Sequence, residues 1–201
     1  NSGKGASEQS NSANTGVGEG SLLRITTGGD NASVGRGSLS YNTTGNSSVG
    51  IGIWAGMGNA TGSANVYVGS SAGKGVANNN NSNNVGIGKD AMVAVTTGSS
   101  NTALGKDSSA AMTDGHNNVS IGNNSLEAST SVGYAVAIGN DAMVNGNATA
   151  DADGTIAIGA SAGAALVSSQ GTTAIGYRAL AAEDDGDFST AVGYDALFSQ
   201  T

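Results

Sequence analysis

The 201-residue sequence contains no cysteine and no proline, and only 4% of its residues are aromatic. Without cysteine, neither a disulfide framework nor a thiolate metal site can form. No apolar run approaches the roughly 20 residues that cross a bilayer, so no membrane insertion by this segment is expected. No signal-peptide pattern begins at Asn1, which indicates a mature product or a fragment. With so few large side chains, an ordinary globular core is not expected either.

Charged residues are also scarce, and they are unevenly distributed. Residues 1–126 carry six bases and six acids, whereas residues 127–201 carry nine acids against Arg178 alone. The net charge of −8 disfavours binding to nucleic acid or to an anionic membrane surface. One end of the molecule is therefore expected to be acidic.

Glycine, by contrast, is abundant, and its spacing reveals an internal repeat. The phrase Asn-Thr-Ala-Leu-Gly at 101–105 returns as Thr-Thr-Ala-Ile-Gly at 172–176 and as Ser-Thr-Ala-Val-Gly at 189–193. The final glycine recurs every 17 residues, except for one spacing of 19 and one of 20. These residues, the anchor glycines, are Gly18, Gly35, Gly52, Gly69, Gly88, Gly105, Gly122, Gly139, Gly159, Gly176 and Gly193. Such a period is the signature of a solenoid, here with eleven coils.

A strand-like triplet precedes each anchor glycine. Its last residue is always aliphatic and its first is mostly Val, Ile or Thr, while the middle residue is small in every coil except at Tyr67. This alternation predicts β-strands. The small residues predict close packing, against either the opposite wall of the coil or a neighbouring chain. A second short strand is expected where Leu or Met stands four residues after the anchor, at Leu22, Leu39, Met92, Met143, Leu180 and Leu197.

Two turns and an asparagine column complete the repeat. The anchor glycine is predicted at a bend, where a positive φ or close backbone approach excludes a Cβ. Thr-Gly or Asp-Gly dipeptides that end seven residues before the next anchor predict a second turn. Asparagine stands four residues before six of the anchors. We predict that these amides stack into a ladder from coil to coil, the alternative being that they are only polar strand-entry residues.

The chain is expected to form one repeat domain at residues 11–201 after a lead-in at residues 1–10. The two long coils place their extra residues in loops near 78–84 and 145–154. A coil of 17 residues encloses only a thin core, so association with copies of the same chain is expected, most simply as a closed cyclic oligomer. Eleven coils at strand spacing would form a rod about 50 Å long.

Three phrases carry a resemblance to a known family: Asn-Thr-Ala-Leu-Gly-Lys-Asp-Ser at 101–108, Ala-Val-Ala-Ile-Gly-Asn-Asp-Ala at 135–142 and Thr-Thr-Ala-Ile-Gly-Tyr-Arg-Ala-Leu at 172–180. They resemble the head repeats of trimeric autotransporter adhesins, the YadA-like head, and equally the related repeats of phage tail fibres. The resemblance covers nearly the whole chain. It implies an all-β parallel β-solenoid, a left-handed β-roll, assembled as a parallel homotrimer. Adhesin heads typically use a shorter coil than the 17 residues found here.

The function that the resemblance implies is attachment, by an extracellular fibre segment on a cell surface or virion, to a host-cell or surface receptor such as a glycan. One alternative is the shaft or receptor-binding segment of a phage tail fibre. Another is a subunit of an extracellular filament whose rods join end to end, because exposed strand edges at solenoid ends invite pairing.

An enzyme is not expected. The only histidine, His116, lies in an Asp-Gly-His turn, and no coil carries acids at matching strand positions, as a glycosidase carboxylate pair would. The Gly-x-Gly pairs belong to the repeat and predict no nucleotide-binding loop. No cofactor is expected, with calcium as the one candidate.

The calcium candidates are four aspartates in equivalent turns two coils apart, Asp151, Asp153, Asp185 and Asp187. The glycine-rich nonapeptide of calcium-binding β-helices is missing, so solvated acidic loops are the favoured interpretation. Glycan or receptor contact is a hypothesis for Trp54, Tyr177 and Tyr194, because sugars stack on flat rings. The favoured alternative is that these rings shield backbone or fill gaps between chains. Tyr177 and Tyr194 stand one coil apart and are expected to stack.

Overall fold

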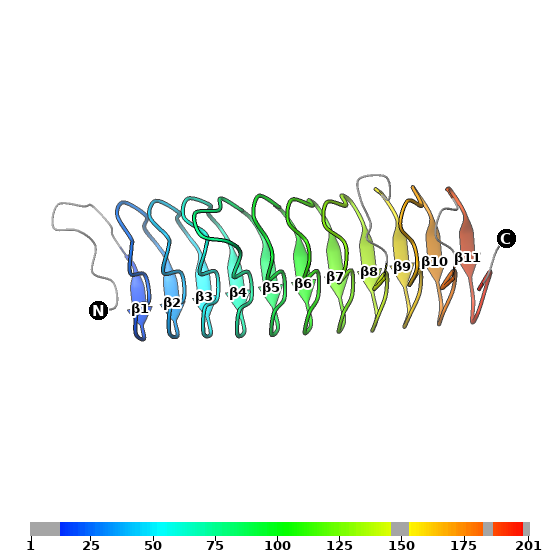
Figure 1. Cartoon of the computed structure of the whole chain (residues 1–201), viewed down its shortest axis with the longest axis horizontal. Coiled ribbons are helices and arrows are strands. Elements are labelled where there is room, and N and C mark those ends of the chain that lie inside the picture. Colours follow the sequence, from blue (N-terminus) through cyan, green and yellow to red (C-terminus); the bar gives the residue numbers. More distant parts are fainter. Residues whose placement is uncertain (1–12, 146–152, 183–186, 199–201) are drawn as a thin grey trace.

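The computed structural model describes residues 13–145, 153–182 and 187–198. Over these residues the chain is an all-β solenoid of stacked coils that contains no helix (Figure 1). Each coil contributes one short strand to a single parallel sheet, and the strands follow one another in sequence order. The strands are β1 (Thr15–Val17), β2 (Ala32–Val34), β3 (Val49–Ile51), β4 (Val66–Val68), β5 (Val85–Ile87), β6 (Thr102–Leu104), β7 (Val119–Ile121), β8 (Val136–Ile138), β9 (Ile156–Ile158), β10 (Thr173–Ile175) and β11 (Thr190–Val192).

The register of the sheet converts each column of the sequence repeat into a row along the rod. Leu104 at the end of β6, for example, pairs with Ile121 at the end of β7. The register also holds across the 19-residue spacing, where Val66 of β4 pairs with Val85 of β5. The extra residues therefore lie in the loop, as expected for 78–84. The predicted loop at 145–154 lies mostly outside the described residues.

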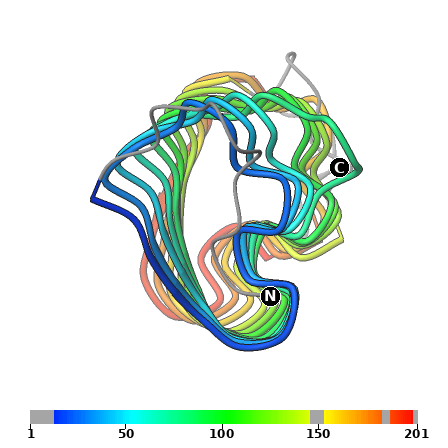
Figure 2. The ribbon, with the colours of Figure 1, turned by 90° about the vertical axis from the view of Figure 1, so that its left-hand side faces the viewer.

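The end-on view in Figure 2 shows that successive coils trace nearly the same outline. Buried side chains fill this outline and gather into apolar clusters along the rod. The interior is also partly polar, because small serines line it. Ser108 Oγ, for instance, lies 2.7 Å from Ser120 Oγ and 3.0 Å from Ser125 Oγ. These hydroxyl groups are buried away from water, and the hydrogen bonds between serines satisfy them.

The small middle residue of each strand faces the interior of its own coil. In β6, Ala103 is fully buried while Leu104 on the outer side is 44% exposed. A Cβ added to Gly50 of β3 would lie 2.5 Å from Ser38 Oγ and 2.8 Å from the Leu39 side chain. The opposite wall of the coil therefore explains the small column. A neighbouring chain, the other possibility, is not what these residues contact.

The predicted second strand does not form. Leu22, Leu39 and Leu180 have φ values of 50°, 47° and 51°, in the left-handed region rather than the extended one. Their side chains are buried, and the backbone still bonds to the next coil, as Leu22 N–H does to the Ser38 carbonyl at 3.1 Å. The prediction was wrong because a coil this short must reverse direction within a few residues. The second wall is a stack of turns that carries core side chains.

The bend at the anchor glycines is confirmed. All eleven anchors have φ between 118° and 142°. From Gly18 to Gly176, a Cβ on each would lie 2.2 to 2.7 Å from the carbonyl oxygen of the next anchor. Adjacent coils thus approach so closely at this corner that only glycine fits. Residues with a Cβ also disfavour the positive φ of this position.

The asparagine ladder is also confirmed. Asn101 Oδ1 accepts hydrogen bonds from the backbone N–H and the side-chain amide of Asn118, both at 3.0 Å. Asn101 Nδ2 donates to the Gly115 carbonyl at 2.8 Å and to Asn84 Oδ1 at 3.2 Å. The side chains are buried. Each amide therefore satisfies backbone groups of the following coil, at the point where the chain passes from the second turn into the strand.

Replacing Asn101 with alanine is expected to lower the free energy of unfolding by about 2–4 kcal/mol, because a buried N–H and a buried carbonyl lose their partners. The exposed Asn123, whose amide contacts only its neighbour Asn124, is the matched control, with an expected change within about 0.5 kcal/mol for Asn123→Ala. Urea unfolding followed by circular dichroism measures both. Equal losses would mean that the ladder adds nothing beyond an ordinary surface amide.

Tyr67, the one large residue in the small column, is fully buried. Its ring fills space that three glycines leave open, since Cβ atoms on Gly56, Gly73 and Gly86 would lie 3.0, 2.2 and 2.9 Å from it. Its hydroxyl donates to Asn81 Oδ1 at 2.6 Å. Burial raises the pKa of this phenol well above its ordinary value. The extra residues of the 78–84 loop therefore supply the polar partner that the buried ring requires.

Candidate functional site

The outer face of the sheet is a largely apolar surface. The first and third residues of each strand point outward, and the third is the aliphatic residue that precedes the anchor. The large residues of this face that are clearly exposed are Val17 (55%), Val34 (40%), Ile51 (43%), Ile87 (36%), Leu104 (44%), Ile175 (36%) and Val192 (67%). The parallel register places them in one row along the rod. We refer to this row, together with the outward first residues of the strands, as the sheet face.

The chemistry of the sheet face suits docking against another apolar surface. A row across eleven strands spaced by about 4.8 Å extends roughly 48 Å. Soluble monomers rarely leave a contiguous apolar patch of this extent facing water, and larger patches usually mark interaction sites. None of the outward residues is charged, and only four of them, Thr15, Thr102, Thr173 and Thr190, are polar, so the surface offers shape and mainly apolar area.

The sequence interpretation missed this surface because it considered packing against a neighbouring chain only for the small column. Period-two alternation shows that a strand has two different faces, and it does not show which face points inward. A usable signal was present in the coil itself. Seventeen residues cannot enclose an aliphatic side chain from the strand and a Leu or Met from the opposite wall. The column with the larger residues therefore had to face outward.

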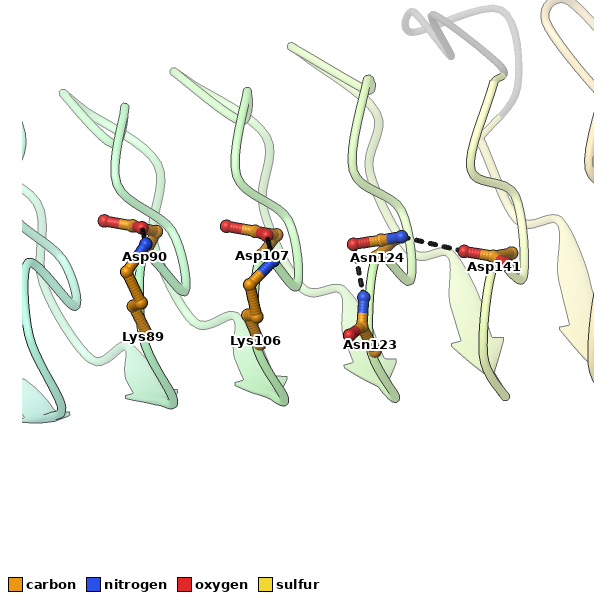
Figure 3. A network of polar contacts seen from close by, with 7 residues as sticks. All are labelled: Lys89, Asp90, Lys106, Asp107, Asn123, Asn124 and Asp141. Carbon is orange, nitrogen blue, oxygen red and sulfur yellow. Dashed lines mark hydrogen bonds and ion pairs between the residues drawn. The ribbon is translucent and has the colours of Figure 1, made fainter.

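A row of polar pairs lies in the turn that directly follows the anchors (Figure 3). Lys89 pairs with Asp90 and Lys106 pairs with Asp107. The hydrogen bond to Asp90 raises the pKa of the Lys89 ammonium. One coil further on, Asn124 Nδ2 donates to Asp141 Oδ1 at 2.9 Å. Asp and Asn tolerate the left-handed backbone that this position adopts. A structural role in the turn is therefore enough to explain why these residues occur here.

The predicted tyrosine stack is confirmed. The rings of Tyr177 and Tyr194 lie 5.1 Å apart at an interplanar angle of 21°. Both are substantially exposed, at 46% and 75%. Arg178 lies beside them, with its guanidinium 4.1 Å from the Phe198 ring centre. The pair is an accessible aromatic ladder, and its contact with a glycan stays a hypothesis.

Trp54 lies in a different setting, in the turn after β3. Its ring covers Gly37 of the preceding coil, where a Cβ would lie 2.8 Å from the indole Cδ1. Arg36 and Lys74 both place their charged groups over the indole, 5.1 and 5.2 Å from its centre. The structure thus separates Trp54 from the tyrosines, and the three rings that the sequence grouped as glycan candidates do not form one site.

Two of the four calcium candidates can be placed. Asp153 Oδ1 accepts a hydrogen bond from Gly133 N–H at 2.6 Å, and Asp187 Oδ1 accepts one from Gln170 N–H at 2.8 Å. Each carboxylate therefore caps the second turn of the preceding coil. Asp151 and Asp185 lie outside the described residues. Within the described ranges, no group of three or more His, Asp or Glu side chains is arranged to hold a metal ion.

His116 lies in the second turn, where its backbone forms parallel bridges to Ser99 and Gly133. Its ring meets the Tyr134 ring edge-on at 5.3 Å. None of the described residues forms a helix long and apolar enough to cross a membrane.

Comparison of the chain with protein-family models, with curated proteins and with solved structures found no match. The repeat phrases therefore remain the basis of any family resemblance.

Proposed function

We propose that this chain is a segment of an extracellular attachment fibre that assembles as a parallel homotrimer, in the manner of an adhesin-head β-roll. The observation that supports the proposal most is the sheet face. It runs along the row of strands, and every strand contributes an outward aliphatic residue as its last residue. Three rods that turn these faces toward a common axis would cover them in a closed, cyclic assembly.

The shape and the repeated surface of such an assembly suit a role in attachment. Its length is set by the number of coils, its surface carries few charges, and its turns recur from coil to coil. Three copies present every contact three times, so weak single contacts with a host-cell or surface receptor add up by multivalency. No step of this mechanism requires catalysis. The repeat phrases resemble adhesin heads and phage tail fibres equally, so a phage tail-fibre segment stays the alternative.

The experiment that tests the proposal is the solution mass of the segment, measured by light scattering at several concentrations. A constant mass three times that of the 19.3 kDa chain is expected. A monomer would overturn the assembly. A mass that grows with concentration would instead support the end-to-end filament.

A pair of charged substitutions locates the contact. Ile87→Lys together with Leu104→Lys places two ammonium groups in the middle of the sheet face and is expected to yield a monomer, because burying an unpaired charge is costly. Val76 is 59% exposed and lies off the sheet, so Val76→Lys is the control and should keep the trimer. Labelled trimer should bind receptor-bearing cells at least about 100-fold more tightly than the monomeric variant. Equal binding by both would contradict the multivalent mechanism.

A further inference from the structure

Cations held on aromatic rings gather along one edge of the N-terminal coils. Arg24 lies with its guanidinium 4.0 Å from the Tyr41 ring centre. Arg36 and Lys74 hold their charges over the Trp54 ring, as described above. Tyr41 N–H bonds to the Met57 carbonyl and Gly58 N–H bonds to the Lys74 carbonyl, so the turns that carry these residues stack directly on one another. The edge covers four consecutive coils, which is about 15 Å at strand spacing.

These three cations have no acidic partner. From Asn31 to Lys89 the sequence contains no aspartate or glutamate. Among the described residues, the ion pairs involve Lys89, Lys106 and Arg178, and none involves Arg24, Arg36 or Lys74. Glu19 precedes Arg36 by one coil in the same column, yet forms no ion pair with it. A protein with a net charge of −8 therefore carries an edge on which three unpaired cations outnumber the one acid, Glu19.

The aromatic rings hold these cations without neutralising them. A cation over a ring face is attracted to the ring quadrupole and keeps its charge, and the N–H groups that point away from the ring stay available. Arg36 is exposed and Trp54 is 37% exposed, so both are accessible from outside. These cations have no carboxylate partner and are held at fixed positions. They are therefore suited to binding anionic groups through charge-assisted hydrogen bonds.

We propose that this edge binds an acidic polysaccharide, a glycan chain that carries carboxylate or sulfate groups. The cations are sparse, one or two coils apart, which suits a ligand whose charges are separated by whole sugar rings. The exposed aliphatic side chain of Ile53, next to Trp54, offers the apolar contact that a sugar ring also uses. This inference names a receptor class for the attachment role proposed above and rests on that role for its biological meaning.

A nucleic acid is the competing polyanion, and the charge distribution opposes it. Tight binding to a phosphate backbone requires many closely spaced contacts, each of which releases a counterion. The edge supplies three cations, and residues 127–201 at the other end of the rod carry nine acids against one base. A long phosphate backbone would find too few cations here and would meet repulsion at the acidic end, whereas a sparsely charged glycan could bind through these four coils alone.

The test is titration calorimetry of the whole chain with a dextran sulfate oligosaccharide, with neutral dextran of the same length as the blank. Binding of the sulfated probe alone is expected. The variant Arg36→Gln/Lys74→Gln should weaken it at least about tenfold, the loss that follows when charge-assisted hydrogen bonds are removed. The matched control is Lys89→Gln/Lys106→Gln, which removes the same charge from lysines already paired with aspartates (Figure 3) and should leave affinity nearly unchanged.

Each other outcome overturns the proposal. Absence of binding would do so, and equal weakening by both double variants would mean that only net charge matters. Tighter binding of a single-stranded oligothymidylate, with the same dependence on Arg36 and Lys74, would assign the edge to nucleic acid.

Trp54→Ala leaves the charge unchanged and should weaken binding several-fold, because Arg36 and Lys74 lose the ring that holds their charged groups in place. Circular dichroism checks that the variants are folded. Since a monomer also carries the edge, a failure here is distinct from a failure to form trimers.

Discussion

Replacing Gly105 with alanine is expected to reduce the free energy of unfolding by about 3 kcal/mol or more, combining backbone strain with a steric clash. Gly105 has a φ of 142°, where an L-residue is strained, and the new Cβ would lie 2.3 Å from the Gly122 carbonyl oxygen. The obstacle is backbone, so it cannot rotate away. Two coils would have to separate, and the hydrogen bonds between them would lengthen.

Gly193 provides a control that separates strain from clash. It has a similar φ of 135°, but the nearest atom to an added Cβ is the Ala196 Cβ at 3.8 Å. Gly193→Ala should therefore cost only the conformational part, about 1–2 kcal/mol. Denaturant unfolding of the two variants beside the parent chain measures the difference. If both lose the same stability, close packing between successive anchors is not what selects glycine.

Replacing Tyr67 with alanine is expected to cost about 3–5 kcal/mol, as other large-to-small changes of buried aromatic residues do. The surrounding residues cannot close the space, because Gly56, Gly73 and Gly86 have no side chains to move into it. The Asn81 amide would also lose the hydroxyl that donates to it at 2.6 Å. Both effects act in the same direction.

Two controls accompany this change, each measured by denaturant unfolding. Tyr67→Phe retains the ring and removes only the hydroxyl, so about 1–2 kcal/mol is expected. Tyr134 is 59% exposed, and Tyr134→Ala should change stability by less than about 1 kcal/mol. A Tyr67→Phe loss as large as that of Tyr67→Ala would show that the hydrogen bond to Asn81, and not the filled space, determines the stability of these coils.

Features that depend on one column of the repeat could be predicted from the sequence. The conformation of Gly105, the amide bonds of Asn101 and the stacking of Tyr177 on Tyr194 each follow from a residue type that returns at the same place in successive coils. In-register stacking converts that recurrence into contact, so no knowledge of distant residues is needed.

Features that depend on how a coil closes could not be predicted in the same way. Leu22 and Leu39 adopt a left-handed backbone that their residue type disfavours, because closure of the coil imposes it. The outward direction of Leu104 depends on what fills the opposite wall. Asn81 lies in an Asn-rich stretch that has the composition of a solvated loop, yet it is buried against Tyr67. Its partner could be identified only after the three-dimensional path of the longer coil was known.

The coil-to-coil backbone bonds also determine how the rod should respond to pulling. Because the strands run across the rod, the hydrogen bonds between them point along its axis, and axial tension loads them in an unzipping geometry. Coils would then open one after another from the end that is pulled. Each opened coil would release about 17 residues of extended chain, roughly 55–60 Å, in place of one strand spacing of about 4.8 Å. A tether built this way lengthens in small steps under load, so it can dissipate force while the remaining coils stay intact.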